Sequence, residues 1–192
     1  LNPSSAASDV YKRQEKEGRL ADACLSSGET ISVDFVVCGI GIRPNDDLAK
    51  KAELKVSNGI NVNEYCQTSD KDIVAAGDCA SFLYNNKLIR LESVQNAIDQ
   101  GEIAAETIFG NKVPYQPYPW FWSDQFETKL QIAGLNIGFN HTIVRKGRRP
   151  GAQSVWYYRD QSLIAVDAMN DSSTYLIASR LLKMQTNLTP EQ

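Results

Sequence analysis

Residues 72–80 read DIVAAGDCA, a short apolar run that ends in a glycine and an aspartate. The pattern predicts a strand over residues 72–76 that runs into a turn at Gly77-Asp78. At the carboxyl end of a sheet strand, a carboxylate can accept hydrogen bonds from sugar-type hydroxyl groups, and a glycine lets the backbone approach a ligand. The alternative is an ordinary turn closed by the aspartate side chain, which is the commoner reading of this pair taken alone.

A helix is predicted after this segment, within the stretch that reads RLESVQNA over residues 90–97. It begins near Ser93, and Gly110 ends it. The backbone N–H groups at Ser93-Val94-Gln95 and the positive end of the helix dipole favour negative charge, such as that on the pyrimidine edge of a reduced flavin. An ordinary capped amphipathic helix is the alternative.

Upstream of these motifs, residues 31–38 read ISVDFVVC and are nearly continuously apolar. Such a run predicts a strand buried on both faces, as in a parallel sheet. It ends in GIG at residues 39–41, where the backbone must turn tightly or approach something closely. A short helix over residues 46–53 and a hairpin turned at Asn58-Gly59 are predicted next.

Downstream, prolines at positions 114, 117 and 119 predict a stiff connector. Trp120-Phe121-Trp122 follows, and these aromatic rings could wall a flat ring such as isoalloxazine or nicotinamide, although core packing is the alternative. Antiparallel strands and a closing helix, capped by Ser172 or Ser173 and ending near residue 184, then predict a small α+β domain. The strand candidates cover residues 129–133, 142–146, 154–159 and 163–168.

The composition excludes several classes of protein. The 192 residues are 42% hydrophobic and 22% charged with a net charge of -3, so neither disorder nor binding of nucleic acid is indicated. The four cysteines form no Cys-x-x-Cys pair and there is one histidine, His141, so no metal site is predicted. No apolar run approaches the roughly 20 residues of a membrane span. Scattered free cysteines favour a reducing compartment.

Five blocks of sequence occur in one order, and together they resemble a known family. The family is the FAD-dependent ferredoxin reductases of oxygenase systems, of the putidaredoxin reductase and rubredoxin reductase type, within the pyridine nucleotide-disulfide oxidoreductase fold. The similarity covers about residues 18–186. The blocks are GIGIRPN in residues 39–45, TSD through AAGDCA in residues 68–80, RLESVQNA in residues 90–97, PWFWSDQ in residues 119–125, and LIAVDAMN in residues 163–170.

The resemblance implies a role for individual positions. FAD would be bound by Gly77 and Asp78, by the helix start at Val94 and Gln95, and by Trp122. NAD(P)H would lie beside Gly39, Gly41 and Glu92, although Glu92 read alone is a solvated charge. The family passes a hydride from NAD(P)H to FAD and single electrons on to an iron–sulfur ferredoxin or rubredoxin, in the cytoplasm. The cofactor carries this chemistry, so no catalytic side chain is predicted.

The resemblance also implies a domain organisation. The fold class is α/β, with partial FAD/NAD(P)-binding Rossmann-like domains, followed by a small α+β C-terminal reductase domain. Both glycine motifs (Gly-x-Gly-x-x-Gly) of the family are missing here, so the chain is predicted to be a C-terminal fragment. The predicted segments are a non-native leader over residues 1–14, the end of the NAD(P)H-binding domain over 15–43, the returning half of the FAD-binding domain over 44–113, and the C-terminal domain over 114–192.

Two other functions stay open. One is a flavin-binding interaction protein of the apoptosis-inducing-factor type, in which the basic residues Arg145, Lys146, Arg148 and Arg149 would steer an acidic partner. A solvated loop is the alternative interpretation of that basic run. The other function is that of a truncated, cofactor-free binding module, whose half-built sheet would leave an apolar edge exposed.

Overall fold

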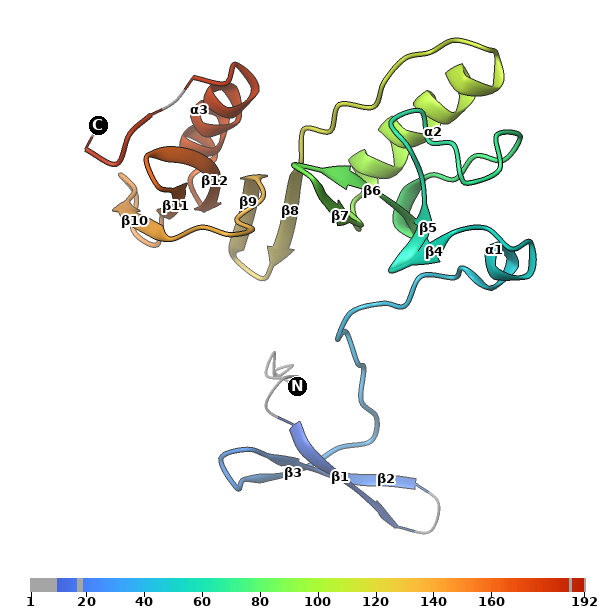
Figure 1. Ribbon diagram of the computed structural model, residues 1–192. Helices are drawn as coiled ribbons and strands as arrows, with labels where there is room; N and C mark the ends of the chain where they lie inside the picture. The colour runs from blue at the N-terminus through green and yellow to red at the C-terminus, as the bar shows by residue number, and fades with distance from the viewer. Residues whose placement is uncertain (1–9, 17–18, 187, 192) are drawn as a thin grey trace. The chain divides into compact units, whose positions relative to one another are not determined.

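The computed structural model describes residues 10–16, 19–186 and 188–191, and the chain divides between Arg43 and Pro44 into two compact units (Figure 1). The first unit contains β1 (Val10–Lys16), β2 (Arg19–Leu25) and β3 (Thr30–Ser32), which pair antiparallel in that order. Residues 10–14 of the predicted leader therefore lie in β1, whereas residues 1–9 are outside the described residues.

The predicted buried strand over residues 31–38 is wrong beyond Ser32. β3 ends there, and residues 34–38 belong to no strand. Phe35 and Val37 are 76% and 78% exposed. A buried strand of a parallel sheet needs a hydrogen-bonded neighbour on each side. No described strand pairs with residues 34–38, so their apolar composition is not enough to make them a strand.

The second unit begins with α1 (Asp47–Lys51) and a four-stranded sheet. The helix and the first hairpin of the sheet agree with the short helix and the hairpin predicted from the sequence. β4 (Val56–Ser57) and β5 (Gly59–Asn61) are antiparallel, β5 pairs parallel with β6 (Ala80–Tyr84), and β6 turns back into β7 (Lys87–Ile89). Val62, Ala80 and Phe82 form the core beneath this sheet.

The predicted strand over residues 72–76 is also wrong, because this segment makes only an isolated antiparallel bridge between Gln67 and Val74. A 3-10 turn, η2 (Gly77–Cys79), follows it and leads into β6. Asp78 therefore precedes a strand instead of following one. Residues 72–76 form a loop, from which Ala75 packs against the core of the β4–β7 sheet. The hydrogen-bonded strand begins only after Asp78, at Ala80.

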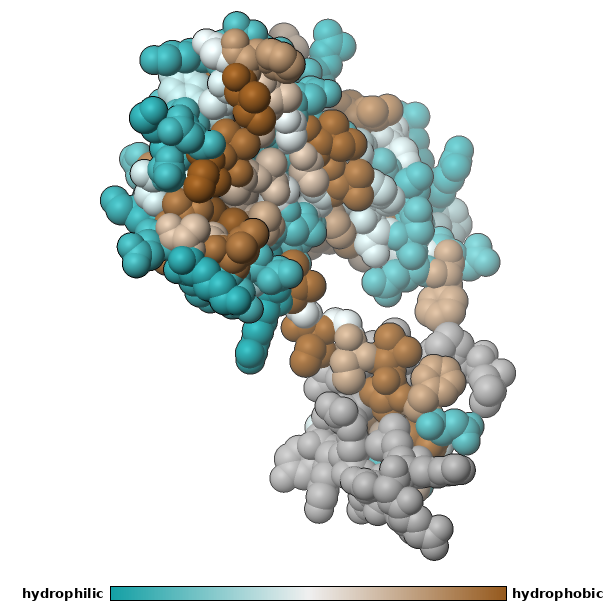
Figure 2. Space-filling model, turned by 90° about the vertical axis from the view of Figure 1, so that its right-hand side faces the viewer, coloured by the Kyte–Doolittle hydropathy of each residue, from teal (hydrophilic) through white to brown (hydrophobic). Residues whose placement is uncertain are grey.

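The predicted long helix is confirmed as α2 (Val94–Ile108). The Ser93 hydroxyl accepts a hydrogen bond from the Asn96 N–H at 3.1 Å, which caps the first turn, and Gly110 with a φ of 84° follows the last. One face of α2 is buried, but Val94 and Ile98 are 60% and 49% exposed. These two side chains leave apolar surface of α2 open to solvent. Figure 2 shows apolar patches on one face of the second unit.

The C-terminal part is a five-stranded antiparallel sheet in the order β10-β11-β12-β9-β8, against which α3 (Ser172–Lys183) packs through β12 and β9. Its core contains Trp156, Tyr158, Leu163, Val166 and Ala178. The strand candidates from the sequence are confirmed, and β8, which contains the aromatic triplet, was missed. The strands are β8 (Trp120–Gln125), β9 (Thr128–Gly134), β10 (His141–Lys146), β11 (Gln153–Arg159) and β12 (Ser162–Met169).

The cap of α3 differs from the prediction. Asp171 accepts the Thr174 N–H at 3.2 Å, and Ser172 and Ser173 are the first two helical residues. An aspartate one position earlier satisfies the same free N–H group, so both serines can enter the helix. Within the part of the chain that the structure describes, no helix is long and apolar enough to cross a membrane.

Candidate functional site

An open hollow of about 580 Å³ lies where η2, the start of α2 and β8 meet. Three of the residues proposed from the sequence, Asp78, Glu92 and Val94, line it. Its remaining lining is Ser93, Ala97, Ile98 and Phe121. The hollow thus combines two carboxylates, the N-terminal end of a 15-residue helix and an aromatic ring. The first N–H groups of a helix have no partner within it, so they are available to an acceptor on a ligand.

The loop beneath Asp78 is held by a buried amide. Gly77 has a φ of 81°, and its N–H donates to Gln100 Oε1 at 2.7 Å. Gln100 is fully buried, so this bond is shielded from water. A Cβ added at Gly77 would lie 3.3 Å from the Cβ of Ala97, which leaves little room for a side chain. Gly77 therefore does not line the hollow, but it fixes the backbone that carries Asp78.

A second support runs from the Asn96 amide to the connector. Asn96 donates to the carbonyl of Leu91 at 3.1 Å, and its Oδ1 accepts from the Tyr115 hydroxyl at 2.6 Å. Burial raises the pKa of Tyr115 above its ordinary value, so the hydroxyl stays protonated, and a donor, well beyond neutral pH. These bonds fix the first turn of α2 against the residues that precede it and against the proline-rich connector.

Arg90 holds two parts of the rim together. Its side chain is 6% exposed, and one Nη donates to Glu92 Oε1 and to the carbonyl of Asp78, each at 2.9 Å. The same side chain therefore sets the position of the carboxylate of Glu92 and of the backbone at Asp78. A buried arginine needs such partners, because an unpaired buried charge is costly.

The aromatic triplet alternates between the two faces of β8. Phe121 lines the hollow, whereas Trp122 does not. Trp122 instead stacks on Trp120 with ring centroids 5.3 Å apart and planes inclined by 26°. Side chains of successive strand residues point to opposite faces, which agrees with the absence of Trp122 from the hollow that Phe121 lines.

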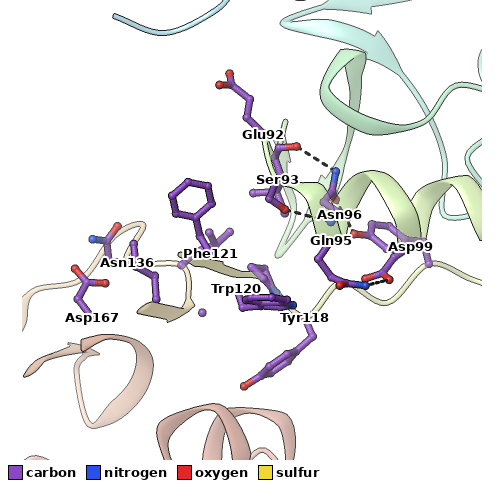
Figure 3. A pocket seen from close by; sticks show the side chains of 16 residues that line it. Glu92, Ser93, Gln95, Asn96, Asp99, Tyr118, Trp120, Phe121, Asn136 and Asp167 are labelled. Carbon is purple, nitrogen blue, oxygen red and sulfur yellow. Dashed lines mark hydrogen bonds between the residues drawn. The ribbon is translucent and has the colours of Figure 1, made fainter. Parts of the chain in front are cut away.

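A second, more enclosed cavity of about 240 Å³ adjoins the hollow and shares Glu92, Ser93 and Phe121 with it. Figure 3 shows Asp167 and Asn136 at one end, Gln95 and Asp99 at the other, and aromatic rings between them. Gln95, which the sequence assigned to the flavin site, therefore lines this cavity with its side chain. Its amide donates to Asp99 Oδ1 at 2.6 Å.

Asp167 is the most unusual group of this second cavity. Its Oδ2 accepts from the Tyr157 hydroxyl at 2.7 Å, and its Oδ1 is buried without a hydrogen-bond partner among the described residues. Burial raises the pKa of Asp167, and the bond from Tyr157 acts in the opposite direction. Within the described residues, no group of three or more histidine, cysteine, aspartate or glutamate side chains could hold a metal ion.

Two sequence families match the chain in consecutive segments. The family described as pyridine nucleotide-disulphide oxidoreductase matches residues 6–101, and the one described as reductase C-terminal matches residues 120–192. The chain belongs to the pyridine nucleotide-disulphide oxidoreductase family. The resemblance found in the sequence and its fold class are thereby confirmed.

Individual relatives agree with this assignment. The chain is 42% identical over 178 residues to rhodocoxin reductase of Rhodococcus erythropolis, which covers 92% of this chain and 42% of that protein. It is 41% identical over 179 residues to putidaredoxin reductase CamA of Pseudomonas putida, which covers 89% of this chain and 42% of that protein. The chain therefore spans less than half the length of these pyridine nucleotide-disulphide oxidoreductases.

Solved structures show the same likeness. The crystal structure of the ferredoxin reductase for the CYP199A2 system from Rhodopseudomonas palustris superposes with a TM-score of 0.86 at 36% identity, over 95% of this chain and 46% of that one. Putidaredoxin reductase in its covalent complex with putidaredoxin gives 0.85 at 34% identity, over 95% of this chain and 45% of that one.

Members of the pyridine nucleotide-disulphide oxidoreductase family bind FAD and NAD(P)H. The N–H groups at Val94 and Gln95 have no described partner, and Asp78 and Phe121 line the hollow beside this helix start, so these groups suit the flavin part of such a ligand. Sequence reasoning missed Arg90, Gln100 and the role of Phe121. The alternation of side chains along a strand would have separated Phe121 from Trp122 had β8 been recognised.

Gly39 and Gly41 belong to the first unit and are described apart from the hollow. Gly41 has a φ of 96°, and a Cβ added at either glycine would meet nothing within 4 Å. The conformation of Gly41 therefore requires glycine for backbone reasons alone. Their assignment to NAD(P)H stays a prediction.

Proposed function

We propose that this chain forms the flavin-facing wall and the C-terminal domain of a reductase that passes electrons from NAD(P)H through FAD to an iron–sulfur ferredoxin or rubredoxin. The observation that carries the proposal is the hollow in which Asp78, the uncovered start of α2 and Phe121 meet. The relatives named ferredoxin, rhodocoxin and putidaredoxin reductase support the choice of acceptor. The resemblance also leads us to propose a cytoplasmic location, which cell fractionation would test.

Each residue has a distinct part in this proposal. The N–H groups at Val94 and Gln95 stabilise negative charge on the pyrimidine edge of the flavin, and the Asp78 carboxylate accepts hydrogen bonds from its sugar-type chain. FAD, when bound, accepts the hydride equivalent and supplies single electrons to the acceptor. Phe121 excludes water near the flavin from within the hollow, whereas Trp122 is outside the lining and stays a proposed FAD contact that rests on the sequence resemblance. Glu92, fixed by Arg90, lies on the nicotinamide side of the flavin. Gly39 and Gly41, which belong to the first unit, are proposed separately as NAD(P)H contacts on the sequence resemblance alone.

A chimeric protein tests this proposal. The present chain replaces the matching region of rhodocoxin reductase, and reduction of rhodocoxin is followed with NADH and with NADPH. We expect turnover with one of them, and Asp78→Ala to weaken FAD binding by at least about tenfold, because a charged acceptor is lost. The exposed Asp124→Asn is the matched control. A folded chimera that retains FAD yet reduces no one-electron acceptor would refute the proposal.

A second candidate function is partner binding through the hairpin between β10 and β11. Arg145, Lys146, Arg148 and Arg149 are exposed there, and none forms a salt bridge with another described residue. Arg145 lies over the ring of Trp156 at 5.5 Å, which leaves the other basic groups free to meet an acidic surface. Replacing Arg148 and Arg149 with alanine in the chimera would separate the two functions, because binding through the hairpin is lost while reduction of ferricyanide continues.

A further inference from the structure

All the charged side chains that line the cavity beside the hollow are acidic. Glu92, Asp99 and Asp167 contribute carboxylates, and the lining contains no lysine, arginine or histidine. Glu92 is paired with Arg90 and Asp99 with the amide of Gln95. Asp167 is the carboxylate with an oxygen still unpaired among the described residues. Leaving a buried acceptor unpaired costs free energy, so a donor brought by a ligand would be favoured at this end.

The walls between these acceptors are aromatic. Tyr118, Trp120 and Phe121 line the cavity, and the Tyr118 hydroxyl is occupied by the carbonyl of Ser179. Ring faces attract cations, and flat rings stack on them. A volume of about 240 Å³ lies below the roughly 300 Å³ at which drug-sized sites begin, so the occupant must be small.

We propose that this cavity binds a small aromatic cation whose N–H groups donate to Asp167 while its ring lies against Trp120 and Phe121. The cavity should prefer a cation to an anion of the same shape, because it has acceptors at one end, aromatic walls and no basic side chain in its lining. The site is distinct from the proposed flavin hollow, because Asp167, Asn136 and Trp120 line only the second cavity. The two cavities share Glu92, Ser93 and Phe121, so the test of this site is made without FAD.

The test uses the chain of 192 residues as it stands and three probes that share one ring. Benzamidine is the cation, benzyl alcohol the neutral probe and benzoate the anion. Tryptophan fluorescence and titration calorimetry measure each affinity. We expect benzamidine to bind at least about tenfold more tightly than benzyl alcohol, and benzoate to bind most weakly. Equal affinities, or no binding of benzamidine, would overturn the proposal.

Two variants locate the bound probe. Asp167→Asn retains an acceptor for Tyr157 but removes the charge, so the preference for benzamidine should disappear. Asn136→Lys changes an exposed residue, which spares the fold, and places a positive charge at the same end, so benzamidine should no longer bind. Persistence of tight benzamidine binding in Asn136→Lys would contradict the proposal even if Asp167→Asn proved unstable.

Two further variants serve as references. Asp124→Asn, an exposed aspartate of β8 outside both cavities, should leave every affinity unchanged. Asp78→Asn changes only the hollow. If Asp78→Asn abolished benzamidine binding and Asp167→Asn did not, the probe would be bound in the hollow, and the proposed site would be wrong.

Discussion

Gly77 shows how much of this site depends on a single residue. Its left-handed backbone, its N–H bond to Gln100 and its closeness to Ala97 occur together at the base of the hollow. Gly110 shares the backbone conformation, with a φ of 84°, but a Cβ there would meet nothing within 4 Å. A comparison of the two glycines therefore separates the free-energy cost of placing a side chain on a left-handed backbone from the cost of its contact with Ala97.

We predict that Gly77→Ala lowers the free energy of unfolding by about 2 kcal/mol or more, and Gly110→Ala by about 1 kcal/mol. The larger loss follows because the added methyl group must displace either α2 or the loop. Urea unfolding followed by circular dichroism measures both changes. Equal losses would show that the contact with Ala97 relaxes without cost.

Two ion pairs of different burial allow a second comparison. The side chain of Arg90 is 6% exposed and has two partners, whereas Lys71 and Asp72 are 85% and 77% exposed. We expect Arg90→Gln to cost about 2 kcal/mol, because the Asp78 carbonyl and Glu92 lose a charged donor. Lys71→Gln should change stability by no more than about 0.5 kcal/mol.

Thermal unfolding of the two variants decides this comparison. In the chimera described above, Arg90→Gln should also weaken FAD binding, because the backbone at Asp78 is no longer fixed. If Arg90→Gln matched Lys71→Gln in both measurements, the arginine would have no structural part in the rim.

At the scale of elements, the N-cap of α3 tests how well the local sequence predicts where a helix begins. Asp171 accepts bonds from Ser173, from the Thr174 hydroxyl and from the Thr174 N–H, and these bonds hold the pKa of its carboxyl below the usual range. Such a carboxylate contributes stability above its unfolded pKa of about 3.9, and this contribution is lost as the pH falls through the lower pKa of the folded state.

We predict that Asp171→Ala costs about 1 kcal/mol at pH 7 and that this difference from the wild type shrinks as the pH falls below about 3.9. Ser173→Ala should cost less at every pH, because the cap bond to the Thr174 N–H remains. Chemical unfolding between pH 7 and pH 2 provides the measurement. A larger effect of Ser173→Ala would restore the serine cap expected from the sequence.

Elements with local signals were predictable, and those that need a distant partner were not. Ser93, Gly110 and Asn58-Gly59 act within a few residues of themselves, and α2 and the β4–β5 hairpin formed as expected. Residues 34–38 and 72–76 are apolar enough for strands, but the first segment pairs with no described strand and the second makes a single isolated bridge. Strand formation depends on hydrogen bonds to another segment, which composition does not report.

The candidate site divides in a similar way. Asp78, Glu92 and Val94 were identified because motif and helix start both lie in the local sequence, and the structure brings them to one hollow. Arg90 and Gln100 were missed because their roles depend on contacts with η2, across 12 and 23 residues of sequence. Buried polar side chains of this kind become recognisable only when their partners are known.

At the scale of the whole chain, the boundary between the two units is open to a simple test. Residues 34–43 form no helix or strand, and Phe35 is exposed, whereas Phe82 lies in the core of the second unit. We predict that brief chymotrypsin treatment cleaves first after Phe35 and releases a fragment that contains the whole second unit, because proteases cut exposed, irregular backbone. Mass spectrometry identifies the products. Early cleavage after Phe82 would show that the sheet from β4 to β7 is not stably formed.

The pair of indole rings on β8 has a consequence for spectroscopy. Trp120 and Trp122 lie 5.3 Å apart and nearly parallel, and Trp120 lines the second cavity. At that separation the strong far-ultraviolet transitions of two indoles couple, so the far-ultraviolet circular dichroism spectrum should carry a paired positive and negative band beside the signal of the backbone. Any ligand or mutation that tilts one ring should change the sign or size of that band. Circular dichroism would therefore report the geometry of this cavity wall without an added label.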